Sequence, residues 1–349
     1  MLVRRLRPAA RNRLPMTFVP FALCIAAVLS AGCAISRSGA GEESAISFEY
    51  VGQTAVPAPI EWIEASDGTE LALRRYVPEA PEATIILFHG GGAHSGAGYQ
   101  RTARRLAEVF GYVLVTPDLR GHGRSGGARG DAPSTERIFK DINEILAHVD
   151  ATLPELPLVL AGHSSGAGLL LNYAEYRRGT EAHGGAAVLN RPGARGANAV
   201  AAYAFLAPFF GFRSDTGRKG GRFSEAKTWP FALNAMSFGL FFGHYHAVEV
   251  AYPQSVLDGD PLLLRSISVN TANAVTPTAP AEQLASLEAP TAIWIGSEDR
   301  VVDPTKLAGF IASNAPGVEV TALSGVEHLE ILTAGAAPLG VWIRRVATR

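Results

Sequence analysis

Short apolar runs alternate with longer stretches of helical periodicity along most of the chain. The expected strands are residues 60–65, 70–76, 84–88, 112–116, 158–162, 291–296 and 318–323, and the expected helices are 99–110, 134–151 and 167–178. The first two strands flank Asp67-Gly68 and predict a hairpin. The later runs, separated by helices, are typical of a parallel sheet covered on both faces. In such a sheet, a site lies beyond the C-terminal ends of the strands.

The pattern is less regular in the middle of the chain. Either residues 186–189 or residues 200–206 supply the sixth strand, and we favour 200–206, which leaves 179–198 as an exposed insertion. Residues 207–282 are expected to form a cap inserted into the domain. Aromatic residues concentrate here, and they either pack the cap onto the domain or line a pocket for an acyl chain. They are Phe209, Phe210, Phe212, Trp229, Phe231, Phe238, Phe241 and Phe242, together with Phe205 just before the cap.

The N-terminus carries a processing signal. Five arginines precede an apolar run at 19–29, and small residues then lead to Cys33, so residues 1–32 are predicted to be a secretory signal peptide. The run is shorter than the roughly 20 residues that span a bilayer. The ending Gly32-Cys33 resembles a bacterial lipobox, in which Cys33 becomes lipidated. An ordinary signal peptide and an uncleaved anchor are the alternatives. Residues 33–55 are expected to be a tether, and 56–349 the folded domain.

Charge and cysteine content restrict the kinds of partner that the protein can have. The full chain has 31 basic and 32 acidic residues. Removing residues 1–32 takes away five arginines, which leaves 26 basic against 32 acidic residues and a net charge of −6. An acidic domain argues against nucleic acid or anionic lipid as the partner. Cys24 lies in the signal peptide, so the mature chain has Cys33 alone and no disulfide, and lipidation would remove that free thiol.

The strand 158–162 leads directly into the pentapeptide Gly162-His163-Ser164-Ser165-Gly166, and a helix follows. A G-x-S-x-G motif on a strand–turn–helix predicts that Ser164 is a nucleophile. A serine hydroxyl is weak until a base accepts its proton. His328 is the only histidine after His246, and it is expected to be that base. Asp299, just past the strand 291–296, is the predicted orienting acid, with Glu298 and Asp303 as competitors.

A glycine-rich loop follows the strand 84–88 and reads His89-Gly90-Gly91-Gly92-Ala93. Glycines allow the backbone to approach a substrate oxygen closely. The backbone N–H of Gly91 and that of Ser165, directly after the nucleophile, are the predicted oxyanion donors. No metal or organic cofactor is expected. His244-Tyr245-His246 alternates like a metal site, but its spacing suggests no third ligand.

Four segments together resemble the α/β-hydrolase superfamily, in its monoacylglycerol lipase, lysophospholipase and serine aminopeptidase-like branch. They are residues 89–95, 117–125, 162–166 and 296–302, and the resemblance covers about 58–190 and 285–335. It implies a mostly parallel eight-stranded sheet flanked by helices, with an inserted cap. It also implies a triad of Ser164, Asp299 and His328, oxyanion donors Gly91 and Ser165, and a structural role for the turn at 117–125, with none in catalysis for His122. One departure is an extra residue between His94 and Tyr99.

The expected function is hydrolysis of carboxylic esters through an acyl-enzyme on Ser164. The resemblance implies a monoacylglycerol, lysophospholipid or fatty ester as substrate. An aminopeptidase or amidase on the same scaffold is one alternative, and a non-catalytic envelope lipoprotein is another. The N-terminal signals predict a bacterial envelope protein held at a membrane surface by lipidated Cys33, or otherwise a secreted or periplasmic protein.

Overall fold

The computed structural model describes Phe48 and residues 56–182, 200–220 and 223–347. The predicted signal peptide, Cys33 and the tether other than Phe48 lie outside these residues. The candidate strand 186–189 and most of the predicted insertion 179–198 lie outside them as well.

In the described part of the chain, eight strands form one sheet in the order β1-β2-β4-β3-β5-β6-β10-β11. The strands are β1 Ile60–Glu64, β2 Glu70–Tyr76, β3 Ala83–Phe88, β4 Tyr112–Pro117, β5 Leu158–His163, β6 Val200–Leu206, β10 Thr291–Gly296 and β11 Glu319–Leu323. Strand β2 is antiparallel to β1 and β4, and the other neighbouring pairs are parallel. The predicted eight-stranded, mostly parallel sheet is confirmed, as is 200–206 as the sixth strand.

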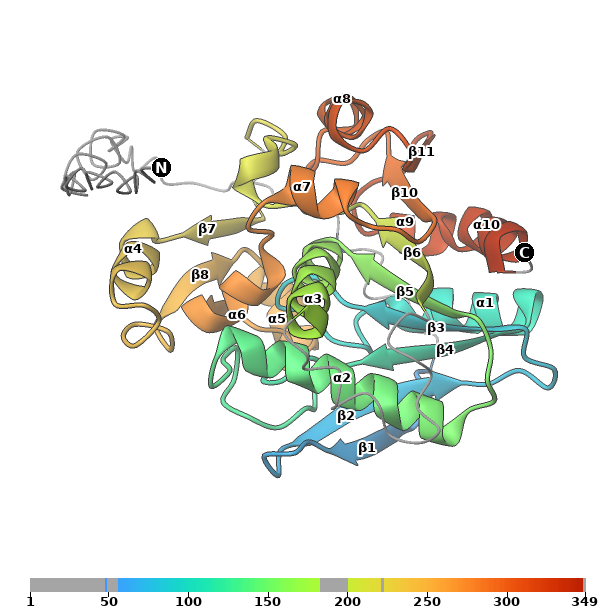
Figure 1. The fold of residues 1–349 in the computed structure, drawn as a ribbon, viewed down its shortest axis with the longest axis horizontal. Coiled ribbons are helices and arrows are strands. Elements are labelled where there is room, and N and C mark those ends of the chain that lie inside the picture. Colours follow the sequence, from blue (N-terminus) through green and yellow to red (C-terminus); the bar gives the residue numbers. More distant parts are fainter. Residues whose placement is uncertain (1–47, 49–55, 183–199, 221–222, 348–349) are drawn as a thin grey trace, which may run out of the picture. The chain divides into compact units, whose positions relative to one another are not determined.

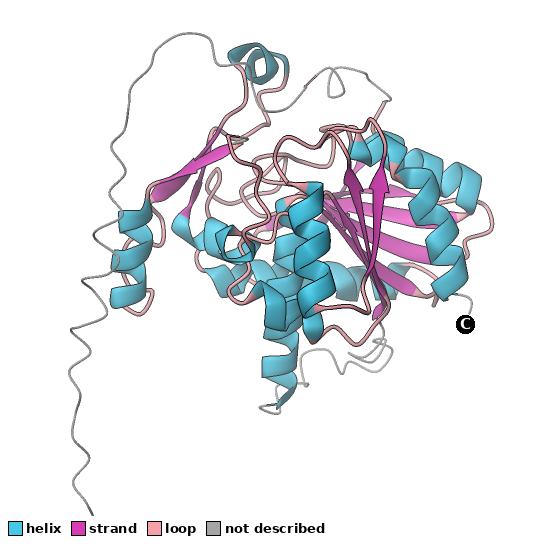
Figure 2. Cartoon of the chain, turned by 90° about the horizontal axis from the view of Figure 1, so that it is seen from above, coloured by secondary structure: helices cyan, strands magenta, loops and turns pink. Residues whose placement is uncertain are grey.

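Helices cover both faces of this sheet (Figures 1 and 2). One face carries α1 Tyr99–Phe110, α9 Ile331–Ala334 and α10 Ala336–Ala347, and the other carries α2 Thr135–Thr152, α3 Ser165–Ala182, α7 Pro280–Ala285 and α8 Pro304–Asn314. Every residue of β3, β4, β5 and β10 is buried, because helices lie on both sides. This is why these strands read as continuous apolar runs rather than as alternating ones.

The segment between β6 and β10 builds a separate small sheet. Strands β7 Ser224–Ala226, β8 His246–Val250 and β9 Ser266–Ser268 pair antiparallel in that order, and α4 Thr228–Met236, α5 Gln254–Gly259 and α6 Val269–Val275 accompany them. We call residues 207–282 the cap. Figure 1 shows β7, β8 and α4 to one side of the large sheet, with α4 farthest from it.

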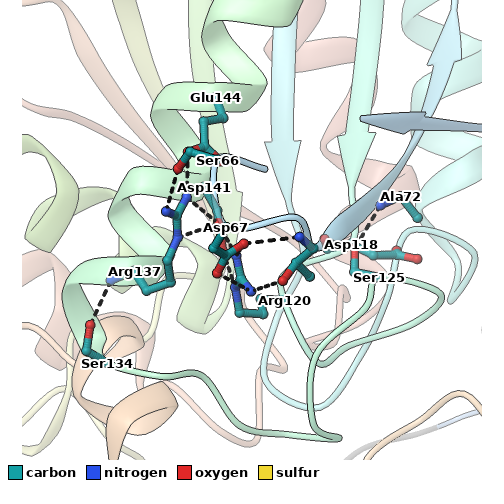
Figure 3. A network of polar contacts seen from close by, with 11 residues as sticks. Ser66, Asp67, Ala72, Asp118, Arg120, Ser125, Ser134, Arg137, Asp141 and Glu144 are labelled. Carbon is teal, nitrogen blue, oxygen red and sulfur yellow. Dashed lines mark hydrogen bonds and ion pairs between the residues drawn. The ribbon is translucent and has the colours of Figure 1, made fainter. Parts of the chain in front are cut away.

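The turn after β4 is held by a network of buried ions (Figure 3). The Arg120 guanidinium donates two hydrogen bonds of 2.7 Å to the Asp141 carboxylate on α2, and Arg137 pairs with Asp141 at 2.8 Å. The Asp118 carboxylate accepts the backbone N–H of Ser95 at 2.6 Å and of Arg124 at 2.9 Å. These contacts fix the turn beside the loop after β3, in keeping with the structural role that the resemblance implies.

Candidate active site

Ser164 occupies the sharp turn between β5 and α3 and has φ 52°, a conformation that is rare for residues other than glycine. The turn requires the two glycines of the motif, because a side chain at either position would collide with neighbouring backbone atoms. A Cβ on Gly162 would lie 2.5 Å from the Gly166 backbone, and one on Gly166 would lie 2.5 Å from the Phe88 carbonyl oxygen. The Ser164 N–H donates to the Leu206 carbonyl at 3.0 Å, which anchors the turn to β6.

The structure brings Ser164, His328 and Asp299 together in one hydrogen-bonded line. His328 Nε2 lies 3.0 Å from Ser164 Oγ, and His328 Nδ1 lies 2.8 Å from Asp299 Oδ2. Asp299 is completely buried, and its Oδ1 accepts the N–H groups of Val301 and Val302 at 2.8 Å each. Burial acts to raise the pKa of Asp299, but His328 and these N–H groups outweigh it and lower the pKa below its usual value.

The two competing acids lie elsewhere. Glu298 is exposed and points its carboxylate at the Ser297 hydroxyl. Asp303 caps α8, where its Oδ1 accepts the N–H groups of Thr305 at 3.0 Å and Lys306 at 3.2 Å. Of the three carboxylates considered from the sequence, only Asp299 contacts the His328 ring.

Contacts to the Gly90 carbonyl orient the predicted oxyanion loop. This oxygen accepts from His89 Nδ1 at 2.9 Å and from the Ala93 N–H at 3.2 Å. A trans peptide directs its N–H opposite to its carbonyl, so the Gly91 N–H points away from these contacts. His89 Nε2 accepts the Leu119 N–H, which assigns the ring proton to Nδ1. Burial lowers the pKa of His89 to about 4, so the ring is neutral at neutral pH.

The other predicted donor lies close to this loop. Ser165 begins α3, so its N–H is at the electropositive end of the helix. A Cβ built on Gly91 would be 3.4 Å from Ser165 Oγ, which shows how closely the loop approaches the turn. Within the described residues, neither the Gly91 nor the Ser165 N–H donates a hydrogen bond. Both groups are therefore free to bind an oxygen, and their role as oxyanion donors stays a prediction.

A buried chain of hydrogen bonds joins the loop after β3, the end of β5 next to Ser164, and the loop that carries His328. Sequence reasoning missed this chain. The Gly90 N–H donates to the Tyr99 hydroxyl at 2.8 Å, and that hydroxyl donates to His163 Nδ1 at 2.8 Å. His163 Nε2 then donates to the His328 carbonyl at 3.2 Å. Burial, with a contribution from His328, lowers the pKa of His163 to about 3, so this ring is neutral. The position of His163 inside the serine motif was the one available signal.

A pocket of about 380 Å³, including its open mouth, lies over Ser164. It is lined by Gly90, Gly91, Ala93, Ala97, Tyr99, His163, Ser164, Phe223, Tyr252, Leu263, His328 and Leu329. Three of these, Phe223, Tyr252 and Leu263, come from the cap. No aspartate, glutamate, lysine or arginine is among the described residues that line it.

The expectation for the aromatic residues of the cap needs correction. None of the nine named from the sequence lines the pocket. Phe205 and Phe210 are buried in the core, whereas Phe212 and Phe238 are 75% and 95% exposed. Neither packing nor acyl binding therefore describes the whole group. Large apolar side chains instead form an exposed surface on α4 and the loop after it, which we call the apolar tip. Its members are Trp229, Leu233, Met236, Phe238, Leu240, Phe241, Phe242 and Tyr245.

The two histidines of the cap with metal-like spacing have separate partners. His244 Nδ1 lies 2.7 Å from Asp131 Oδ2, and His246 Nδ1 lies 2.8 Å from the Ser266 hydroxyl. Among the described residues, no three or more His, Cys, Asp or Glu side chains gather as a metal site would require. In that same part of the chain, no helix has both the length and the apolar content to cross a bilayer.

Comparison with known proteins shows the family to which the chain belongs. The family described as "Serine aminopeptidase, S33" matches residues 79–332. Monoglyceride lipase of Homo sapiens is 36% identical over 118 residues, which are 33% of this chain and 37% of that protein. Monoacylglycerol lipase of Mycolicibacterium smegmatis is 30% identical over 107 residues, or 30% and 38% of the two chains. The chain thus spans well under half the length of these curated relatives.

Among solved structures, a soluble variant of monoglyceride lipase from Saccharomyces cerevisiae superimposes with a TM-score of 0.61 at 18% identity, covering 87% of this chain and all of that one. This likeness concerns the fold. The family match covers most of the chain and includes the glycine-rich loop, the serine motif, Asp299 and His328. The chain therefore belongs to the serine aminopeptidase S33 family of the α/β-hydrolase superfamily.

Proposed function

We propose that this protein is a serine hydrolase that cleaves carboxylic esters through an acyl-enzyme on Ser164. His328 Nε2 accepts the hydroxyl proton while Ser164 Oγ attacks the ester carbonyl carbon. The carbonyl oxygen becomes an oxyanion, to which the N–H groups of Gly91 and Ser165 donate. The tetrahedral intermediate collapses and expels the alcohol, which takes the proton from His328. Water, deprotonated by the same imidazole, then releases the acid and restores Ser164.

One observation carries the proposal: the Ser164 hydroxyl, the His328 ring and the Asp299 carboxylate form a continuous line of hydrogen bonds of 3.0 and 2.8 Å. The Asp299 carboxylate binds the Nδ1 proton, which leaves the Nε2 lone pair facing the serine. It also stabilises the imidazolium that forms during attack. No other described histidine contacts Ser164 Oγ in this way.

The lining of the pocket favours esters over aminoacyl substrates. An aminopeptidase must hold the charged α-ammonium of its substrate, and a desolvated ammonium needs a carboxylate partner. The described lining residues include no carboxylate, and Phe223, Leu263 and Leu329 present apolar surface instead. A monoacylglycerol, lysophospholipid or fatty ester matches this surface, and the similarity to monoglyceride lipases supports the same class. The amidase alternative keeps the triad but lacks this support.

The apolar tip favours a substrate that is met at a lipid surface. Residues 228–243 contain no charged side chain, and most of their large apolar groups are exposed. Such a surface is stabilised when it enters the interfacial region of a bilayer or micelle. The proposal extends to the envelope: a lipidated Cys33 would hold the domain at the membrane from which it takes its substrate.

Labelling with a fluorophosphonate tests the proposal, because only an activated serine reacts. Wild-type protein should be labelled and the Ser164→Ala variant should not. The same substitution should lower turnover of a p-nitrophenyl ester by about 10³-fold or more. Folded wild-type protein that resists labelling would favour the non-catalytic envelope role. A panel of esters with two to eighteen acyl carbons, matched with amide and aminoacyl substrates, decides the bond type and the acyl length.

A further inference from the structure

The cap touches the oxyanion loop at three points. The Tyr252 hydroxyl donates to the Gly91 carbonyl at 3.2 Å, and the Leu264 N–H donates to the Gly92 carbonyl at 2.9 Å. Farther along the loop, His94 Nε2 lies 2.8 Å from the Asp260 carboxylate. Tyr252, Leu264 and Asp260 all belong to the connection between β8 and β9, so one segment of the cap makes all three contacts.

This contact is close-packed. A Cβ on Gly92 would lie 3.0 Å from the Leu264 carbonyl oxygen and 3.1 Å from the Tyr252 ring, and Gly92 has φ +70°. The Tyr252 ring is itself held by Phe223, whose centroid is 5.1 Å away in an edge-to-face arrangement, and by Phe48 at 5.6 Å. The hydroxyl therefore reaches the loop from a ring that is fixed on two sides.

We propose that Tyr252 is a positioning residue: by holding the Gly91 carbonyl, it couples the seating of the cap to the orientation of the oxyanion donor at Gly91. This inference rests on the proposed function. The Gly91 carbonyl and the Gly91 N–H belong to successive peptide groups, so the contact limits rotation about the bonds that join them. His89 and Ala93 hold one of these peptides from the core side, and Tyr252 holds the next from the cap side.

Three consecutive glycines make such external restraint necessary. Gly90, Gly91 and Gly92 have no side chains to limit their backbone, and glycine visits more conformations than any other residue. An oxyanion donor acts only when it points at the developing charge before reaction begins. The Tyr252 hydroxyl stays protonated, because burial raises its pKa above the usual value. It thus remains a donor across the pH range in which esterases are assayed.

The test compares Tyr252→Phe with a matched control, Tyr112→Phe. Both tyrosines donate to a backbone carbonyl, Tyr112 to that of Gly340 at 2.9 Å, but Tyr112 lies on β4 and does not line the pocket. Each substitution removes one oxygen and keeps the ring. In Tyr252→Phe we expect kcat for a short p-nitrophenyl ester to fall about tenfold, the size of one lost hydrogen bond, with KM unchanged. Tyr112→Phe should keep the wild-type kcat.

The affinity for transition-state analogues is a second measurement, and it would not change if Tyr252 had only a structural role. A trifluoromethyl ketone forms an oxyanion on Ser164, so its affinity for Tyr252→Phe should fall by the same factor as kcat/KM. The affinity for a fatty alcohol, which forms no oxyanion, should not change. Unchanged kcat and ketone affinity would overturn the proposal. So would a raised KM at unchanged kcat, which would make Tyr252 a substrate-binding residue.

A second variant covers the case in which Tyr252→Phe does not fold. Asp260→Asn removes the charge from the contact between Asp260 and His94, and it should also lower kcat, by a smaller factor and again without a change in KM. An unchanged kcat would count against the proposal. Fluorophosphonate labelling of the wild type separates the two levels of inference. If the wild type is not labelled, the proposed function fails. If the wild type is labelled, and Tyr252→Phe and Asp260→Asn are labelled at the same rate as the wild type, only the positioning role is refuted.

Discussion

Replacing Asp299 by asparagine tests the triad most directly, because the structure dictates how the amide must sit. Asp299 Oδ1 accepts two backbone N–H groups, from Val301 and Val302, at 2.8 Å each. An amide nitrogen there would meet two donors, so the amide oxygen of Asp299→Asn takes the Oδ1 position. Its NH₂ group then faces His328 Nδ1, which must become an acceptor.

This arrangement inverts the tautomer of His328. With Nδ1 accepting, the ring proton moves to Nε2 and points at Ser164 Oγ, so the imidazole no longer accepts the serine proton. Loss of the correct tautomer with the geometry kept lowers turnover by about 10⁴-fold, or about 5.5 kcal/mol of transition-state stabilisation. Asp299→Ala leaves the ring free to choose its tautomer. We therefore expect asparagine to be at least as damaging as alanine, although it is the more conservative change.

Hydrolysis of p-nitrophenyl butyrate and the rate of fluorophosphonate labelling measure this loss. The matched controls are Glu298→Gln and Asp303→Asn, the other carboxylates of the same loop. Both should keep near-wild-type activity, and asparagine is itself a good helix cap at position 303. An Asp299→Asn variant within tenfold of wild type would refute the assignment, as would a control that loses as much as Asp299→Asn.

Two further outcomes are expected from the structure, and a third from the sequence of the N-terminus. Burial lowers the pKa of His89 to about 4 and of His122 and His163 to about 3. The unfolded chain binds protons near pH 6.5 that the folded chain excludes, so stability is lost as pH falls below 6.5, by about 2 kcal/mol per ring at pH 5. Equal denaturation midpoints at pH 7.5 and 5 would contradict this. Replacing Phe238 and Phe241 by serine should lower activity on micellar esters but spare soluble ones, and equal loss on both would argue against interfacial binding. Labelled palmitate should enter the wild type and not Cys33→Ala, and equal labelling would remove the lipid anchor.

Most of the fold could be predicted because its signals are local. The continuous apolar runs at 84–88, 158–162 and 291–296 become buried strands of the large sheet. The topology then brings the residues after these strands close together, since parallel strands end at one edge of the sheet. Ser164 and Asp299 each follow such a strand end, so predicting the strands was enough to predict that these residues lie near one another.

The placement of the side chains in the cap could not be predicted in the same way. Residues 228–243 are hydrophobic without a helical or strand period, and their composition alone favoured burial. Phe238 and Phe242 have positive φ values of 52° and 63°, and both side chains are exposed in the tight loop that follows α4. Whether such a segment faces a core or a lipid surface depends on what it meets in space. Tyr252 was missed for the same reason, because its partner on the oxyanion loop is 161 residues away.

The histidines around Ser164 show why residue type alone does not identify the base. His163 adjoins the serine in sequence and His89 precedes the oxyanion loop, yet both are neutral rings whose partners are tyrosine or backbone groups. Without a carboxylate in contact, a buried imidazole resists protonation, and the pKa values of both rings fall accordingly. His328 differs in its contacts, because its Nδ1 lies 2.8 Å from the Asp299 carboxylate. On the proposed mechanism, the carboxylate selects which of several nearby imidazoles accepts the serine proton, and it is the feature to seek first in a sequence with many histidines.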